Sequence, residues 1–86
     1  MIVEFYGRIT GYTNGDKVYT PKNHSVIKTL LEELSDYYGD EFNAVLQGSE
    51  TCLILVNGKG MMLSGGLETP LHAGDKIEIL PFVDAG

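Results

Sequence analysis

The sequence predicts an α+β roll, in which a mixed sheet of four to five strands packs on one main helix. Two segments, residues 2–8 and 76–80, alternate apolar and polar side chains with the period of a half-buried strand. Residues 27–38 instead repeat apolar side chains with helical spacing. At 86 residues the chain is long enough for one core and too short for two. We therefore expect a single domain over residues 1–82, followed by a flexible C-terminal tail, residues 83–86.

The N-terminal part is expected to form an antiparallel hairpin. Its first strand, residues 2–8, carries Arg8 at its end, and its short second strand is residues 17–20. The connection, residues 10–16, is rich in turn-forming residues and contains Asn14-Gly15, a dipeptide that favours a tight turn.

The main helix is predicted over residues 27–38, because one apolar stripe recurs there at spacings of three and four residues. Ser25, or alternatively Asn23, is expected to cap its N-terminus with a side-chain oxygen. Gly39 is expected to end it, since glycine readily adopts the backbone conformation that follows a helix. The segment 40–47 is interpreted as a single helical turn that packs back on the core.

The C-terminal half is expected to supply the rest of the sheet. The continuous apolar run of residues 51–56 predicts a central strand that is covered on both faces or nearly so. A turn at Asn57-Gly58 and a short edge strand at residues 61–63 follow. The last strand, residues 76–80, is expected to lie parallel to the first strand in the centre of the sheet.

Charge and cysteine content exclude several classes of protein. The net charge of −6 argues against nucleic-acid and anionic-membrane partners, which select clustered Lys and Arg. Cys52 stands alone and is interpreted as a small buried hydrophobe, with a reactive thiol as the weaker alternative. His24 and His72 lack metal-ligand neighbours in sequence and are expected on the surface, so no metal or cofactor is expected to bind. Without a signal peptide or a long apolar run, the chain is expected to be cytoplasmic.

The sequence resembles the β-grasp (ubiquitin-like) sulfur carriers, above all the small subunit of molybdopterin synthase. The strand and turn Leu55-Val56-Asn57-Gly58, followed by Gly74-Asp75-Lys76-Ile77 and by Leu80-Pro81 near the terminus, form a fairly specific combination. The segments that carry the resemblance are spread over nearly the whole chain: residues 3–8, 26–34, 54–58 and 69–81.

This resemblance implies a carrier without catalytic machinery of its own. An E1-like adenylating enzyme would use ATP-Mg to activate the C-terminal carboxylate of Gly86, and a sulfur donor would convert it to a thiocarboxylate. The large subunit of molybdopterin synthase would hold the precursor that receives the sulfur in molybdenum or tungsten cofactor biosynthesis. The tail that enters a partner's active site would consist of Val83, Asp84, Ala85 and Gly86.

The residue pattern supports such a tail and a docking surface beside it. A terminal glycine has no Cβ, so its carboxylate can be approached in a narrow channel. Strand alternation predicts that Leu55, Leu80 and Phe82 form an exposed apolar patch, which is typical of a partner-binding surface. Alternatively, the middle loop, Met61 or Met62 covers this patch.

The end of the chain leaves other functions open. The family ends in Gly-Gly, whereas this chain ends in Ala85-Gly86, which favours a β-grasp interaction module that is never activated. A sulfur carrier of another pathway, such as thiamine synthesis, shares the fold and the ending. An enzyme ranks last, because no nucleophile and base pair is recognisable. A β-grasp ferredoxin is excluded, because its cluster needs four thiolates.

Overall fold

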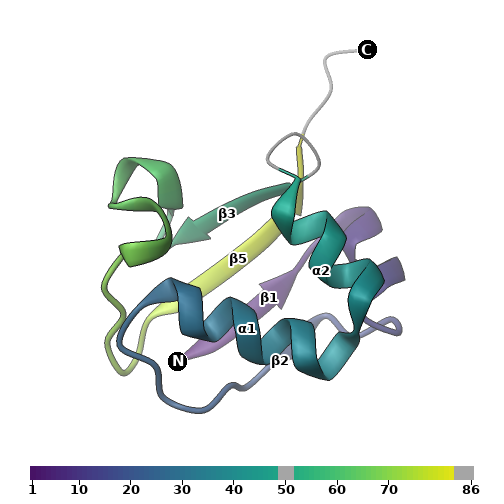
Figure 1. The fold of residues 1–86 in the computed structure, drawn as a ribbon, viewed down its shortest axis with the longest axis horizontal. Helices are drawn as coiled ribbons and strands as arrows, with labels where there is room; N and C mark the ends of the chain where they lie inside the picture. The colour runs from purple at the N-terminus through teal and green to yellow at the C-terminus, as the bar shows by residue number, and fades with distance from the viewer. Residues whose placement is uncertain (49–51, 83–86) are drawn as a thin grey trace.

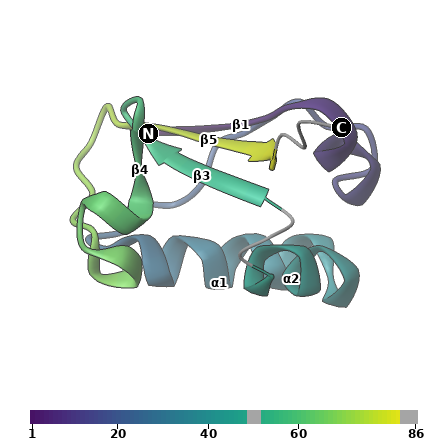
Figure 2. The same cartoon turned by 90° about the horizontal axis from the view of Figure 1, so that it is seen from above.

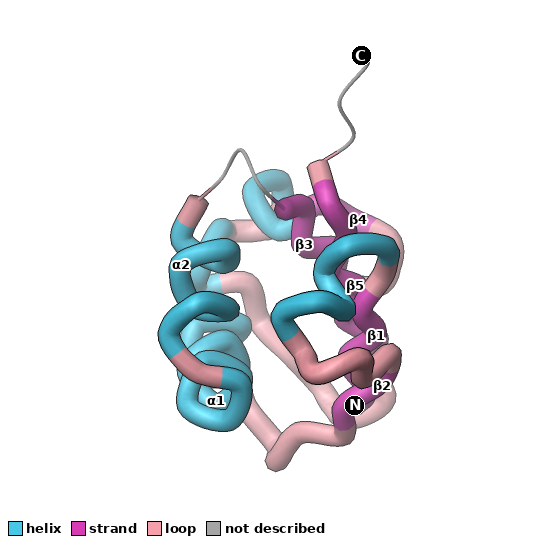
Figure 3. The backbone as a smooth tube through the Cα atoms, turned by 90° about the vertical axis from the view of Figure 1, so that its right-hand side faces the viewer, coloured by secondary structure: helices cyan, strands magenta, loops and turns pink. Residues whose placement is uncertain are grey.

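A five-stranded mixed sheet forms one layer of the described residues, and two α-helices cover one of its faces (Figures 1 and 2). The computed structural model describes residues 1–48 and 52–82. Figure 3 shows the same separation from another side, with α1 and α2 on one side and the strands on the other. The strands are β1 (Ile2–Phe5), β2 (Val18–Tyr19), β3 (Cys52–Val56), β4 (Lys59–Gly60) and β5 (Lys76–Pro81), in the order β2-β1-β5-β3-β4. The helices are α1 (Ile27–Tyr38) and α2 (Asp40–Gln47).

The first and last strands are parallel neighbours in the centre of the sheet, as the sequence predicted. Val3 lies opposite Ile77, and Phe5 lies opposite Ile79. All four side chains are almost fully buried beneath the helices. Alternation along both strands therefore builds the core from one face of the sheet.

The first strand is shorter than predicted, although its antiparallel pairing with β2 is confirmed. The strand ends at Phe5, and residues Gly7–Tyr12 form a 3₁₀ helix that includes Arg8. Gly7 has φ of 57°, which turns the chain out of the extended conformation. The prediction that Arg8 lies on a strand was therefore wrong.

Helix α1 has the predicted bounds and the predicted end at Gly39, but neither predicted cap is used. The N-cap residue is Val26, whose backbone is extended and whose side chain makes no capping bond. The Ile27 N–H donates to the carbonyl of Thr69 at 3.0 Å, and the Leu71 N–H donates to the carbonyl of Ser25 at 2.9 Å. A backbone carbonyl that is distant in sequence thus accepts from an N–H group at the helix start, where a local side chain was expected to do so.

Helix α2 spans eight residues rather than the single turn that was expected. It starts directly after Gly39, whose φ of 100° redirects the chain. Phe42 is fully buried, and its ring centroid lies 5.9 Å from that of Phe5 and 5.3 Å from that of Tyr38. This aromatic contact fixes α2 against the end of α1 and the sheet.

Strand β3 is paired on both sides, as the prediction of a central strand requires, but it is not covered on both faces, which corrects that part of the prediction. Cys52, Ile54 and Val56 are buried, whereas Leu53 is 40% exposed. The strand pairs antiparallel with β5 on one side and with the two-residue strand β4 on the other. Among the described residues, helices cover only one face of this sheet, so these residues leave the other face of an entirely apolar strand open.

The predicted edge strand at residues 61–63 is also wrong. Asn57 and Gly58 have φ of 51° and 85° and make a tight turn, so pairing begins at once with Val56 opposite Lys59. Strand β4 therefore precedes the expected segment, and Met61–Leu63 form a 3₁₀ helix. A further 3₁₀ helix, Gly66–Glu68, follows it.

Candidate functional site

The open face of the sheet carries an apolar patch on β3 and β5. We call Leu53, Leu55, Leu80 and Phe82 the outer-face patch. Leu53 lies directly opposite Leu80 in the strand pairing, and Phe82 follows β5 immediately. Leu55 and Leu80 are half-buried, whereas Phe82 is 49% exposed. The structure thus brings together the three residues that the sequence predicted for this surface.

Leu53 was missing from that predicted set. Strand alternation alone puts it on the same face as Leu55, but its contact with Leu80 depends on the register between β3 and β5. Side chains directly opposite on neighbouring strands are about 5 Å apart at Cβ, so the pair forms one continuous surface. The patch is therefore broader on β3 than expected.

The alternative that Met61 or Met62 covers the patch is not what the structure shows. Met62 is 78% exposed and lines a groove of about 400 Å³ together with Leu53 and Phe82. Leu63 and Leu67, both exposed, line the same groove. Leu46 of α2 and the buried Cys52 and Ile54 line it as well, whereas Leu55 and Leu80 do not, so the loop after β4 adjoins the outer-face patch at Leu53 and Phe82 without covering Leu55 or Leu80.

The other half of the open face is charged. The Tyr6 hydroxyl donates to Glu4 and, at 3.2 Å, to Glu78. The Lys76 Nζ lies 3.6 Å from a Glu4 carboxylate oxygen and 3.9 Å from one of Glu78. The hydrogen bond to Glu4 is the largest of the effects that raise the pKa of Tyr6 to about 12, so its phenol remains a donor at neutral pH. Lys76 thus interacts with carboxylates of its own sheet.

Backbone packing anchors the end of β5 where the predicted tail begins. The Tyr6 N–H donates to the Ile79 carbonyl at 3.0 Å. A Cβ added to Gly7 would lie 3.1 Å from Cγ of Pro81, and the φ of Gly7 is in the left-handed region. Glycine at this position lets the first turn after β1 approach the last residue of β5 closely. The tail residues Val83, Asp84, Ala85 and Gly86 lie outside the described residues, so their roles stay predictions.

The remaining candidate residues separate into buried and exposed groups. Cys52 is buried, as predicted, and its Sγ donates to the Val45 carbonyl at 3.4 Å. Burial raises the pKa of this thiol, which makes it a poor nucleophile. The His72 side chain is exposed as expected, but the His24 side chain is only 16% exposed, which corrects its surface prediction. A hydrogen bond to Glu33 accounts for its position.

No group of three or more His, Cys, Asp or Glu side chains in residues 1–48 and 52–82 is arranged to hold a metal ion. Within the same ranges, no helix has the length and apolar character that crossing a membrane requires.

Comparison with known proteins identifies one family. The sequence matches the ThiS family over residues 3–86. No curated protein matches the sequence.

Solved structures share the fold over nearly the whole chain. A chain of the BexX/CysO complex from Amycolatopsis orientalis has a TM-score of 0.81 at 22% identity, covering 99% of this chain and 98% of that chain. The small archaeal modifier protein SAMP1 from Methanosarcina acetivorans has a TM-score of 0.78 at 26% identity, covering 99% and 94%. A chain from the complex of subunits 1 and 2 of molybdopterin-converting factor from Helicobacter pylori has a TM-score of 0.66 at 27% identity, covering 99% and 96%. These matches confirm the β-grasp fold that the resemblance implied.

Proposed function

Because this chain belongs to the ThiS family of β-grasp sulfur carriers, we propose that it carries sulfur as a C-terminal thiocarboxylate on Gly86. The family is one of carriers rather than enzymes, so the chemistry would be performed by partner proteins. We place the chain in molybdenum or tungsten cofactor biosynthesis, with the role of the molybdopterin synthase small subunit.

The observation that carries this proposal is the position of the outer-face patch. Phe82 is exposed at the end of β5, and Leu53 and Leu80 continue the apolar surface from it. A partner that covers this patch would hold the chain where the four residues after Phe82 enter its active site. Four extended residues span about 13 Å, which is enough to reach a nucleotide or a precursor in a channel.

The proposed chemistry has two steps at the same carboxylate. A carboxylate oxygen of Gly86 attacks the α-phosphate of ATP on the adenylating partner, and pyrophosphate leaves. Sulfide supplied by a donor then attacks the acyl carbon as HS⁻, AMP leaves, and loss of the remaining proton yields the thiocarboxylate. This chain contributes the anchored end of β5 and a terminal residue without a Cβ.

Two kinds of partner follow from the proposal. The first is an E1-like enzyme that uses ATP-Mg, and the second is the large subunit of molybdopterin synthase. The structural match to a chain of the Helicobacter pylori complex supports the second partner. The match to a chain of the BexX/CysO complex supports binding to a partner protein more generally.

Ala85 supports a second candidate function, a β-grasp subunit that binds through the outer-face patch and is never activated. A methyl group at the penultimate position disfavours left-handed backbone by roughly 1–2 kcal/mol if the bound tail requires it. Within the carrier proposal itself, sulfur carriers of other pathways, such as thiamine synthesis, are the alternative to the molybdenum cofactor.

The deciding experiment is the intact mass of the protein after incubation with an adenylating enzyme from the same cell, ATP-Mg and a sulfur donor. We expect the mass to rise by the difference between one sulfur and one oxygen atom. Deletion of Gly86 should abolish the gain. Addition of a molybdopterin synthase large subunit with its precursor should then return the mass to its starting value, whereas a thiazole-forming synthase should leave it unchanged.

The variant Ala85→Gly is the matched control for the second candidate. If it gains sulfur and the natural chain does not, the penultimate methyl blocks activation and the chain acts as a binding subunit. If both gain sulfur equally, Ala85 is compatible with a carrier. If neither variant reacts with an enzyme that activates other family members, the carrier proposal is wrong.

A further inference from the structure

The charged half of the open face directly adjoins the outer-face patch. We use this term for Glu4, Tyr6, Lys76 and Glu78. Leu55 of the patch lies opposite Glu78 in the pairing of β3 with β5, and Glu78 lies opposite Glu4 in the pairing of β5 with β1. Side chains directly opposite on neighbouring strands are about 5 Å apart at Cβ. One apolar side chain and two carboxylates therefore form a continuous row across three strands.

The two carboxylates of this row receive few donors from their own chain. Tyr6 has one hydroxyl proton, so it can donate fully to Glu4 or to Glu78 but not to both at once. Lys76 Nζ lies 3.6 Å from a carboxylate oxygen of Glu4 and 3.9 Å from one of Glu78, which is too far for a hydrogen bond. Among the described residues, the hydrogen bonds and ion pairs of the two carboxylates thus come from one phenol and one ammonium group.

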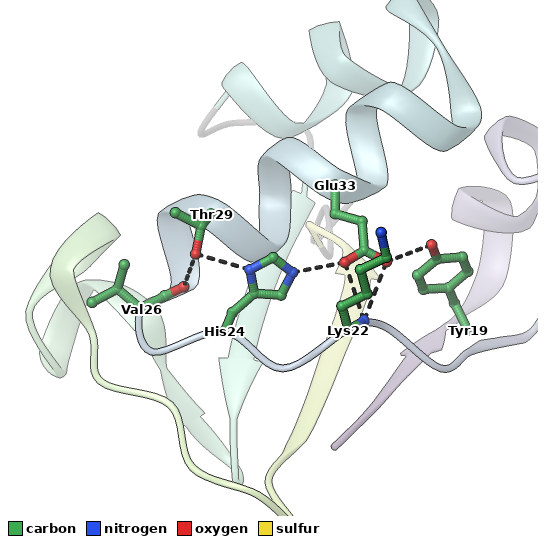
Figure 4. Close-up of polar contacts among 6 residues, drawn as sticks. All are labelled: Tyr19, Lys22, His24, Val26, Thr29 and Glu33. Atoms are coloured by element: carbon green, nitrogen blue, oxygen red, sulfur yellow. Dashed lines mark hydrogen bonds and ion pairs between the residues drawn. The ribbon is translucent and has the colours of Figure 1, made fainter.

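Glu33, in the helix layer, is in the opposite situation (Figure 4). Its side chain is 18% exposed, close to the 20% of Glu78 and the 26% of Glu4. It accepts three hydrogen bonds from its own chain, which come from the hydroxyl of Tyr19, an imidazole nitrogen of His24 and the N–H of Lys22. Glu4 and Glu78 instead keep hydrogen-bonding capacity that water can fill.

Burial of the outer-face patch would remove that water. A partner that covers Leu55 and Leu80 also covers Glu78, because Glu78 lies between them on the same face of two paired strands. A carboxylate that leaves water is destabilised unless a charged donor replaces the hydrogen bonds that it loses. A partner that binds tightly through the patch must therefore supply such a donor beside Leu55.

We propose that the open face selects a partner surface that combines an apolar area with an arginine, whose guanidinium binds both Glu4 and Glu78. This inference rests on the proposed function, because it defines the chemistry of the partner at the same surface. A guanidinium has five N–H donors in a planar arrangement, which can serve two neighbouring carboxylates at once. It is also less strongly hydrated than the ammonium of lysine and is therefore easier to bury.

The charges of the chain disfavour other occupants of this face. Its net charge is −6, from 12 Asp and Glu against 6 Lys and Arg, and it repels nucleic acid and anionic lipid. A second copy in a two-fold contact would present the same face and would add its own Glu4 and Glu78 to the first two carboxylates. A cationic group on a different protein is the occupant that complements these charges.

Affinity for the adenylating enzyme from the same cell tests the proposal, measured by titration calorimetry in about 0.1 M salt. Glu78→Gln keeps the size and one acceptor oxygen of the side chain but removes its charge. We expect this variant to bind at least tenfold more weakly, because the buried guanidinium loses a charged partner. Asp36→Asn is the matched control, since Asp36 is an exposed carboxylate on α1. It should change the affinity less than about twofold, and equal effects of the two variants would overturn the proposal.

Lys76→Gln gives a prediction of the opposite sign. Lys76 is the cation that already lies beside Glu4 and Glu78, so it competes with a guanidinium from the partner. Its removal should strengthen binding by about twofold or more. If Lys76→Gln weakens binding as much as Glu78→Gln does, the face acts through its own ammonium group and the proposal is wrong.

An arginine-to-lysine scan of the docking surface of the adenylating enzyme identifies the group that contacts Glu78. One such variant should weaken binding to the natural chain by about fivefold or more and leave binding to Glu78→Gln nearly unchanged, because both changes remove the same contact. If the effect of every arginine variant adds to that of Glu78→Gln, no guanidinium contacts Glu78 and the proposal is contradicted.

Phe82→Asp separates this inference from the proposed function. If it weakens binding at least tenfold while Glu4→Gln and Glu78→Gln do not, the outer-face patch binds the partner and only the inference about arginine is wrong. If none of the three variants changes the affinity, the proposed docking surface is wrong as well. Urea unfolding should find both glutamine variants as stable as the natural chain, because removing one of two opposite like charges relieves a repulsion. Any loss of affinity is then an effect on binding.

Discussion

Strands β3 and β5 hold an apolar pair of opposite residues on each face of the sheet, and only one of these two pairs is covered by helices. Ile54 and Ile79, opposite each other on the inner face, are almost fully buried beneath the helices. Leu53 and Leu80, also opposite each other but one residue along, lie on the open face, and Leu53 is partly exposed to solvent. Hydrophobicity alone therefore does not distinguish a core residue from a binding residue in this sheet. Whether an apolar residue of the described strands lies in the core depends on the helices, because α1 and α2 cover one face of the sheet.

The largest difference in stability between the two faces is expected when neighbouring residues of β5 are truncated to alanine. Ile79→Ala should lower the free energy of unfolding by about 2–5 kcal/mol, because the removed atoms leave a cavity in a packed core. Leu80→Ala, on the open face, should lower it by less than about 1.5 kcal/mol, since its side chain is already half in solvent. Urea unfolding of both variants measures the difference. Equal losses would mean that the open face is as tightly packed as the core.

The second effect concerns binding rather than stability. Phe82→Asp should weaken binding to an adenylating enzyme or to a molybdopterin synthase large subunit by at least tenfold, or about 1.4 kcal/mol, because a charge would enter an apolar contact. Val18→Asp is the control, since Val18 is an exposed apolar residue on the same open face but on the edge strand β2. Titration calorimetry on both variants tests the location of the surface, and equal affinity for both would show that Phe82 is not in it.

The smallest effect on stability is expected at the start of β5. There the strand is held by polar side-chain contacts and not by apolar packing on a face of the sheet. Asp75 accepts from the Asn57 side chain at 2.9 Å and from the His72 N–H at 2.7 Å. The bond from Asn57, followed by that from His72, holds the pKa of Asp75 below its usual value. The ionised Asp75 carboxylate therefore stabilises the fold at pH values above the pKa of an unfolded aspartate, about 3.9. This stabilisation is lost as the pH falls through the lower pKa of Asp75 in the folded protein.

The variant Asp75→Asn tests this contribution by acid unfolding. The natural chain should lose more stability than the variant between about pH 5 and about pH 3, and the two should converge at lower pH. A gap between them that stays constant over this range would show that ionisation of Asp75 does not matter.

Much of the fold could be predicted because its signals are local. The apolar stripe of α1 gave its bounds, and Gly39 gave its end. Alternation in β5 separated Ile77 and Ile79 from Glu78 and Leu80, and the structure keeps that separation. These features depend on spacing along one element, and spacing can be read without knowing what the element contacts.

The candidate site was predictable in part. Leu55, Leu80 and Phe82 follow from strand alternation, whereas the contribution of Leu53 required the register between two strands. The roles assigned to residues 83–86 lie outside the described residues and remain predictions from the resemblance. The charged half of the open face was missed, because Glu4, Tyr6 and Lys76 come from opposite ends of the chain.

The sequence by itself determined the main helix and the alternating faces of the long strands, and the tertiary structure decided which of their surfaces are covered. The run of residues 52–56 is apolar throughout, yet it is half open, because both helices lie on one side of the sheet. Helix α1 starts without a side-chain cap, because the carbonyl of Thr69 accepts its first N–H. His24 lies in a loop and is largely buried, because Glu33 binds it from the helix. In each case the deciding partner is distant in sequence, and such partners cannot be read from local spacing.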